Sequence, residues 1–309
     1  MKTGKTYFSV AHSLGAADSA TIASYLQHIG SRKKAEALLL QEGGASGNWF
    51  GSNSSKPWQA TGMVVGYIPP GQTDSQVPVI SAAAMQGDQT LVSTRVKISL
   101  DRFFVQEYPG SGTHKILCEF AGKNQVISSS KTNKRSKDTE EMRFAFNTQA
   151  NDNEHASVSG HPIFLGVVVG SDGLSFEGRT VNVGSKINDA VQKMLGSPIF
   201  KNGLSLMTSA QPALKPFVGL AGSVVEAVAK SKDNYQVHNF NLGLDFSENI
   251  TSAKLRHGSY VIIQTNQTDW NWSNIHWSPD ALCLIDSRTG KSVEANYLVL
   301  GVSPFSEEV

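Results

Sequence analysis

Short apolar runs recur from residue 91 to the end of the chain, and this pattern constrains the fold more than any other feature. Gly, Pro, Asn, Asp or Ser residues bound most of the runs. Several of them, such as LVSTRVKISL (91–100), alternate apolar and polar residues as half-buried strands do. Repeated short strands with turn residues between them are typical of two packed antiparallel sheets. We therefore expect a β-sandwich domain over residues 91–309.

The first 90 residues follow a different pattern and are expected to form a helical and loop-rich region. Residues 17–41 have helical spacing, with Asp18 or Ser19 as the cap and Gly30 as a break between two helices. The Gly-, Ser- and Asn-rich stretch 43–58 has the composition of a loop. Together the two parts predict an α+β protein that is mainly β.

A helical insertion is expected within the sandwich over residues 186–232. Its clearest part is an amphipathic helix near 212–230, in which Pro212 and Pro216 fit the first turn. The interpretation we favour is a helix packed over the sandwich. The alternative is a membrane-active segment over 204–230, because this is the most apolar long stretch of the chain. The membrane contacts would then be made by Leu214, Phe217, Val224 and Val225.

The charge balance makes nucleic acid an unfavoured partner. The chain has 27 basic and 26 acidic residues and a formal charge of +1. The basic concentration at 131–137 is followed at once by the acidic residues of DTEE (138–141). Capture of phosphates needs a net basic field or stripe, which this arrangement does not supply.

The sequence shows no recognisable targeting signal, and its two cysteines lie in apolar runs. Both features favour a cytoplasmic location, with export by another route left open. The N-terminal residues contain no continuous apolar stretch of the kind found in signal peptides. No run of 18 or more apolar residues is long enough for a spanning helix. Cys118 and Cys283 lie within short apolar runs, which predicts that both are buried core thiols.

Catalytic and nucleotide-binding motifs are absent from the sequence, so no cofactor is expected. No phosphate-binding loop is present, and GLSFEG (173–178) lacks the setting of a nucleophilic serine. Cys118 follows His114 by four residues, so a strand would place both side chains on one face. Because its neighbours are apolar, a core cysteine is favoured over a thiolate nucleophile.

The polar stretch 151–161 is the weak candidate for a metal site. The residues Asp152, Glu154, His155 and His161 are of types that bind zinc or calcium. Their spacing matches no standard metal-binding pattern. An ordinary polar loop is therefore favoured, and no metal is expected.

Three of the five tryptophans, Trp270, Trp272 and Trp277, lie close together in QTDWNWSNIHWSPD (267–280). An extended strand would place the first two rings on one side. The favoured interpretation is that they cover one end of the core. The alternatives are a ligand platform, with hydrogen bonds from Asp269 and Asn274, and a membrane-interface contact.

The function we expect is that of a non-enzymatic binding or interaction protein that presents loops on a β-sandwich. Its ligand would be a protein or a small polar molecule such as a carbohydrate, bound at 269–277 together with 151–161 or 171–173. Two alternatives stay open: a membrane-active effector or toxin, and a hydrolase in which His114, His155 or His161 converges with Asp or Cys in a pocket. A homo-oligomer is also left open.

Overall fold

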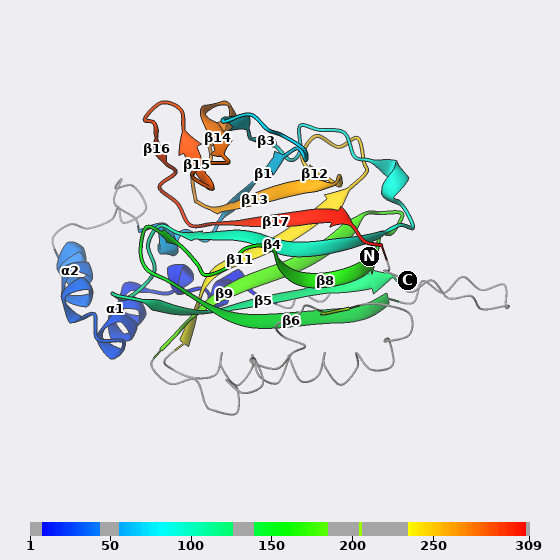
Figure 1. The fold of residues 1–309 in the computed structure, drawn as a ribbon. Coiled ribbons are helices and arrows are strands. Elements are labelled where there is room, and N and C mark those ends of the chain that lie inside the picture. Colours follow the sequence, from blue (N-terminus) through cyan, green and yellow to red (C-terminus); the bar gives the residue numbers. More distant parts are fainter. Residues whose placement is uncertain (1–7, 44–55, 126–138, 185–203, 206–233, 307–309) are drawn as a thin grey trace.

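Two antiparallel sheets lie face to face and form the body of the protein (Figure 1). The computed structural model describes residues 8–43, 56–125, 139–184, 204–205 and 234–306. Apolar residues at alternate positions along the strands point into the space between the sheets, as the sequence pattern predicts. The fold is α+β and mainly β, as expected.

The larger sheet has eight strands in the order β10-β8-β4-β17-β13-β1-β3, with β7 also paired to β4. Its neighbours are antiparallel except for β10, which runs parallel to β8. The strands are β1 (Met63–Ile68), β3 (Ile80–Ser81), β4 (Arg95–Val105), β7 (Glu154–His155), β8 (His161–Val168), β10 (Leu204–Ser205), β13 (Gly258–Gln264) and β17 (Tyr297–Pro304).

The second sheet has five strands in the order β12-β11-β9-β5-β6. Its three central pairings are antiparallel and long, whereas β12 runs parallel to the end of β11. The strands are β5 (His114–Gln125), β6 (Thr139–Ala150), β9 (Leu174–Val183), β11 (Asn234–Asp245) and β12 (Ala253–Lys254).

The main core fills the space between these sheets. Ile98, Ile262 and Leu300 from the larger sheet share one apolar cluster with Phe120 and Phe240 from the smaller one. All five side chains are almost completely buried. Burial of each large apolar side chain is worth about 1.5–3 kcal/mol, so this cluster is the principal source of stability.

A small third sheet covers part of the outer face of the larger sheet, around β13 and β17 (Figure 1). A second core, containing Val261, Val299 and Leu284, lies between the two. Strands β13 and β17 are therefore buried on both faces, which explains their almost continuous apolar sequences. The third sheet consists of β2 (Val77–Pro78), β14 (Ile275–Ser278), β15 (Cys283–Asp286) and β16 (Lys291–Ser292).

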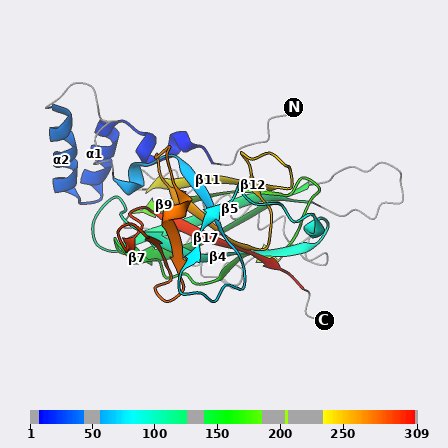
Figure 2. The ribbon, with the colours of Figure 1, turned by 90° about the horizontal axis from the view of Figure 1, so that it is seen from above.

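Two helices, α1 (Ser19–His28) and α2 (Arg32–Gly43), lie together at one end of the sandwich (Figure 2). The carboxylate of Asp18 accepts a hydrogen bond from the Thr21 amide and caps α1, as predicted. Gly30, with a φ of 85°, separates the helices. The described residues also include short 3-10 helices: η1 (Val10–His12), η2 (Leu14–Ala16), η4 (Pro57–Gln59), η5 (Gln89–Leu91) and η6 (Trp272–Asn274).

The sandwich has a helix-side end and an opposite end, and β9 runs between them. Val183 pairs with Lys115 beside the helices, whereas Leu174 pairs with Leu244 at the other end. The ten residues of β9 separate these ends by about 30 Å.

The expected division of the chain near residue 90 stays a prediction, although β1 and β3 complete the larger sheet from its N-terminal side. The expected helix at 212–230 lies outside the described residues. Of the insertion 186–232, only the short strand β10 is described.

Candidate functional site

The Trp loop, Asp269–Trp277, lies on the outer face of the larger sheet and mainly supports the second core. Trp270, Trp272 and Trp277 are half-buried and pack against that core. The Trp272 ring lies against Gly66 of β1, where an added Cβ would be 2.5 Å from Cζ3. The rings thus have a packing role, but they pack on the second core rather than over one end of the main core as the favoured interpretation expects.

Trp270 and Trp272 do not lie on one extended strand. Trp272 begins the 3-10 helix η6, which Asn271 caps by accepting a hydrogen bond from the Ser273 amide. The two rings meet edge to face at a centroid distance of 5.7 Å. Asn274 is half-buried, and Asp269 is exposed.

The four weak metal candidates lie in four different settings. Asp152 bonds to His114, and Glu154 accepts a hydrogen bond from Asn151. His155 packs against Phe104, while His161 packs against Phe144 and Phe146. No group of three or more metal-binding side chains forms within the part of the chain that the structure describes.

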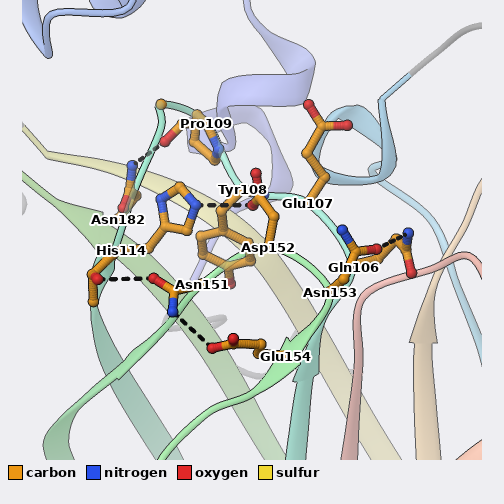
Figure 3. Close-up of polar contacts among 12 residues, drawn as sticks. Gln106, Glu107, Tyr108, Pro109, His114, Asn151, Asp152, Asn153, Glu154 and Asn182 are labelled. Carbon is orange, nitrogen blue, oxygen red and sulfur yellow. Dashed lines mark hydrogen bonds and ion pairs between the residues drawn. The ribbon is translucent and has the colours of Figure 1, made fainter.

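A connection at the helix-side end, Tyr108–His114, is held by side chains from several other elements (Figure 3). We call it the braced loop. Side-chain donors reach two of its carbonyls: the Asn182 amide bonds to Pro109 O at 2.8 Å, and Lys34 Nζ bonds to Gly110 O at 2.6 Å. Thr113 Oγ1 donates to Asn151 Oδ1 at 2.8 Å. Bonds of this kind fix a loop that has no regular structure of its own.

Asp152 is the central acceptor of the braced loop (Figure 3). Its Oδ1 lies 2.9 Å from the backbone nitrogen of Tyr108 and 2.9 Å from Nε2 of His114. Burial opposes ionisation of this carboxyl, but the hydrogen bonds from His114 and Tyr108 outweigh it and hold its pKa below the ordinary value. An ionised Asp152 favours the His114 tautomer with hydrogen on Nε2.

His114 is buried, and the edge of its ring with Cε1 and Nδ1 faces Gly110. A Cβ added to Gly110 would lie 3.9 Å from both ring atoms and 3.1 Å from Ile29 Cδ1. The φ of Gly110 is 109°, a conformation that L side chains rarely adopt. Glycine thus keeps the space between the loop, α1 and the imidazole open.

That space belongs to a pocket of about 490 Å³, which we call the helix-side pocket. The end of α1, the braced loop and the ends of β5 and β9 line it. Its volume falls within the range of about 300–1,000 Å³ that is typical of small-molecule sites.

Cys118 lies on the same strand as His114, as expected, and is a buried core thiol. Burial raises the pKa of its thiol, which keeps it protonated. Cys283 is also buried, so both cysteine predictions are confirmed.

A larger groove of about 880 Å³ lies at the opposite end, but its cationic side chains are engaged within the protein. Lys254 is buried and bonds to Asp245, Ser252 and the carbonyl of Asn249. Arg256 donates to the carbonyl of Gln86. Because these contacts hold the groove's own loops together, the smaller helix-side pocket is the better candidate site.

The loops expected to join the Trp loop are found at different ends. Asn153 bonds to Gln106 beside the braced loop, which places 151–154 at the helix-side end. Residues 171–173 lie at the opposite end, where Gly173 contacts the backbone of Leu244.

The expected membrane contacts Leu214, Phe217, Val224 and Val225 lie outside the described residues and stay predictions. Within the described ranges, no helix is sufficiently long and apolar to cross a bilayer.

Sequence reasoning noted His114 and Asp152 but did not pair them, and it missed the braced loop. The sequence feature that could have indicated the loop is PGSGTH (109–114), a Gly-rich connection between two strands that ends in a histidine. Comparisons of the chain with protein-family models, with curated proteins and with solved structures find no match.

Proposed function

We propose that this chain is a binding protein and that its ligand, a small polar molecule, occupies the helix-side pocket. The observation that carries the proposal is the bracing of Tyr108–His114 around that pocket. A loop fixed before the ligand arrives loses little conformational entropy on binding. The buried ring of His114, aligned by Asp152, supplies a directional polar contact.

The test compares one substitution at the two candidate loops. Ser111 lies in the lining of the pocket, and Ser273 lies in the Trp loop; both are exposed. Ser111→Trp places an indole at the pocket mouth, whereas Ser273→Trp leaves the pocket open. A fragment set of mixed charge is screened against each variant and the wild type by ligand-observed NMR.

We expect fragments that bind the wild type and the Ser273→Trp variant but not the Ser111→Trp variant. Thermal unfolding of the two variants checks that both are folded. Binding lost only in the Ser273→Trp variant would assign the site to the Trp loop. A complete absence of fragment binding to the wild type would overturn the proposal.

A hydrolase is the second candidate, and the observation that favours it is the His114–Asp152 pair beside a pocket. With Nε2 directed to Asp152, Nδ1 is the ring nitrogen left to accept a proton from water. Incubation with p-nitrophenyl acetate and p-nitrophenyl phosphate tests this reading. Release of nitrophenol that is lost in His114→Asn would support hydrolysis, whereas binding without turnover supports the binding protein.

A further inference from the structure

The side chains that line the helix-side pocket include basic and imidazole groups but no carboxylate. His28, His114 and Lys115 are among the lining residues, and none of the lining residues is Asp or Glu. Lys115 is exposed, and its ammonium group has no hydrogen-bond or ion-pair partner within the described residues. Lys115 therefore contributes a formal positive charge to the lining, and no lining carboxylate opposes it.

Two carboxylates that share bonding partners with the pocket lining, Glu107 and Asp152, are already paired with donors. Glu107 forms ion pairs with Lys34 and Lys56 at 3.5 and 3.1 Å. Asp152 accepts hydrogen bonds from His114 and the Tyr108 amide. Their negative charge is partly offset at close range, so it opposes an incoming anion less than a free carboxylate would.

The backbone of the braced loop adds donors. Gly110 and Ser111 line the pocket, and their N–H groups donate to no atom of the described residues; the same holds for Gly112 beside them, which is not part of the lining. Gly110 and Gly112 have φ values of 109° and 79°. Successive amides in such turns can surround an anion, because several N–H groups then point into one concavity.

Apolar side chains form another part of the wall. Ile29, Pro109 and Val183 lie in the same lining. Ile29 Cδ1 is close to Gly110, at the point where the loop meets α1. A ligand that uses both parts of the wall combines an anionic group with an apolar body.

From this arrangement we infer that the helix-side pocket selects a small organic oxyanion, a phosphate ester or a carboxylate carried on an apolar group. The inference rests on the proposed function of the pocket. Lys115 and the loop amides bind the anionic oxygens, and the apolar wall contacts the body. The Nδ1 edge of His114 accepts a hydrogen bond from a ligand hydroxyl.

The experiment uses four probes that share a phenyl group and differ in charge: phenyl phosphate, benzoate, benzyl alcohol and benzylamine. Binding to the full chain is measured by isothermal titration calorimetry at low and moderate ionic strength. We expect the two anions to bind more tightly than the alcohol, and the amine to bind least. Affinity for the anions should fall as salt increases, since exposed charges are screened.

Lys115→Ala and Lys123→Ala are the matched variants. Both lysines are exposed on β5, eight residues apart and therefore on the same face, so about 26 Å separates them. Lys115→Ala should weaken anion binding by about fivefold, the upper range for one exposed charge. Lys123→Ala should leave it unchanged.

The outcomes separate the inference from the function on which it rests. Tighter binding of the alcohol or amine would overturn the anion preference and leave the pocket as a ligand site. Equal loss in both lysine variants would mean that the anions bind nonspecifically, which also overturns the inference. If none of the four probes binds, the anion inference is also overturned. The mixed-charge fragment screen then decides whether the pocket binds any ligand. A difference between phenyl phosphate and benzoate distinguishes the two sources of oxyanion.

Discussion

The Trp loop leads from β13 into the third sheet and the braced loop joins β4 to β5, and different forces hold the two loops. Half-buried indole rings fix the Trp loop by packing on the second core. Side-chain hydrogen bonds fix the braced loop, and most of their donors and acceptors lie on other elements. The first loop uses its most conspicuous side chains for its own stability. The second keeps backbone amides and one edge of an imidazole available beside a pocket.

This difference shows that a conspicuous cluster of residues in the sequence does not by itself mark a candidate binding site. A cluster of tryptophans is conspicuous in a sequence, yet large amphipathic rings often serve as packing. A Gly-Ser-Gly connection is less conspicuous, but here it is the element around which buried polar groups converge. Substitutions in or beside each loop should therefore have different effects on stability and on ligand binding.

The largest effect is expected for Trp272→Ala. Its ring packs on Gly66 and on the second core, so truncation should lower the free energy of unfolding by about 3 kcal/mol. Urea denaturation measures the change. Ligand affinity of the folded variant should equal that of the wild type, because the pocket lies elsewhere. A loss of affinity at unchanged stability would reverse the roles assigned to the loops.

Asp152→Ala should have the next largest effect. It leaves His114 Nε2 and the Tyr108 amide without their acceptor, which costs about 2 kcal/mol. Since the folded-state pKa of Asp152 is lowered from 3.8, its contribution is complete above that pH and is lost as the pH falls through the folded-state pKa. The stability difference from the wild type should therefore narrow below pH 3.8.

Asp74→Ala is the control, because Asp74 is exposed and has no bonding partner among the described residues. It should change the free energy of unfolding by less than about 0.5 kcal/mol. A constant difference between the Asp152→Ala variant and the wild type from pH 7 to pH 2 would contradict the assigned role of the Asp152 carboxylate.

Lys34→Met tests the link between α2 and the braced loop. It removes the bond to Gly110 O and the ion pair with Glu107, and should cost about 1 kcal/mol because the lysine is partly exposed. Amide hydrogen exchange should accelerate at Tyr108, the amide of the braced loop that donates to Asp152. Lys33→Met, at an exposed neighbour on the same helix, should not produce this acceleration. Equal exchange in both variants would mean that Lys34 does not brace the loop.

The smallest effect is expected for Asp269→Ala in the Trp loop. Asp269 is exposed, so stability should change by less than about 0.5 kcal/mol, and ligand affinity should not change. Calorimetry with a fragment that binds the wild type gives the affinity. A tenfold loss would support the ligand platform that the tryptophan cluster suggests.

Much of the fold could be predicted from local patterns. Alternation along β4, the continuous apolar run of β13 and the Asp18 cap each report a short-range preference. The hairpin between β15 and β16 also follows a local preference, because Gly290 adopts a φ of 67° in its turn.

The Trp loop was harder to predict because side chain and backbone compete locally. The Asn271 side chain bonds to the Ser273 amide and hydroxyl and favours a 3-10 turn over the extended form. The candidate site could not be predicted from the sequence, for another reason. His114 and Asp152 are 38 residues apart, and only the pairing of β5 with β6 brings them together.

The central claim is that the ligand lies against the braced loop rather than on the Trp loop. The most direct test is a crystal structure of the chain with the fragment that binds it most tightly. We expect ligand density in the helix-side pocket, within hydrogen-bond distance of the Gly110 or Ser111 amide or of His114. Ligand density over Trp270 and Trp272, with the helix-side pocket empty, would contradict it.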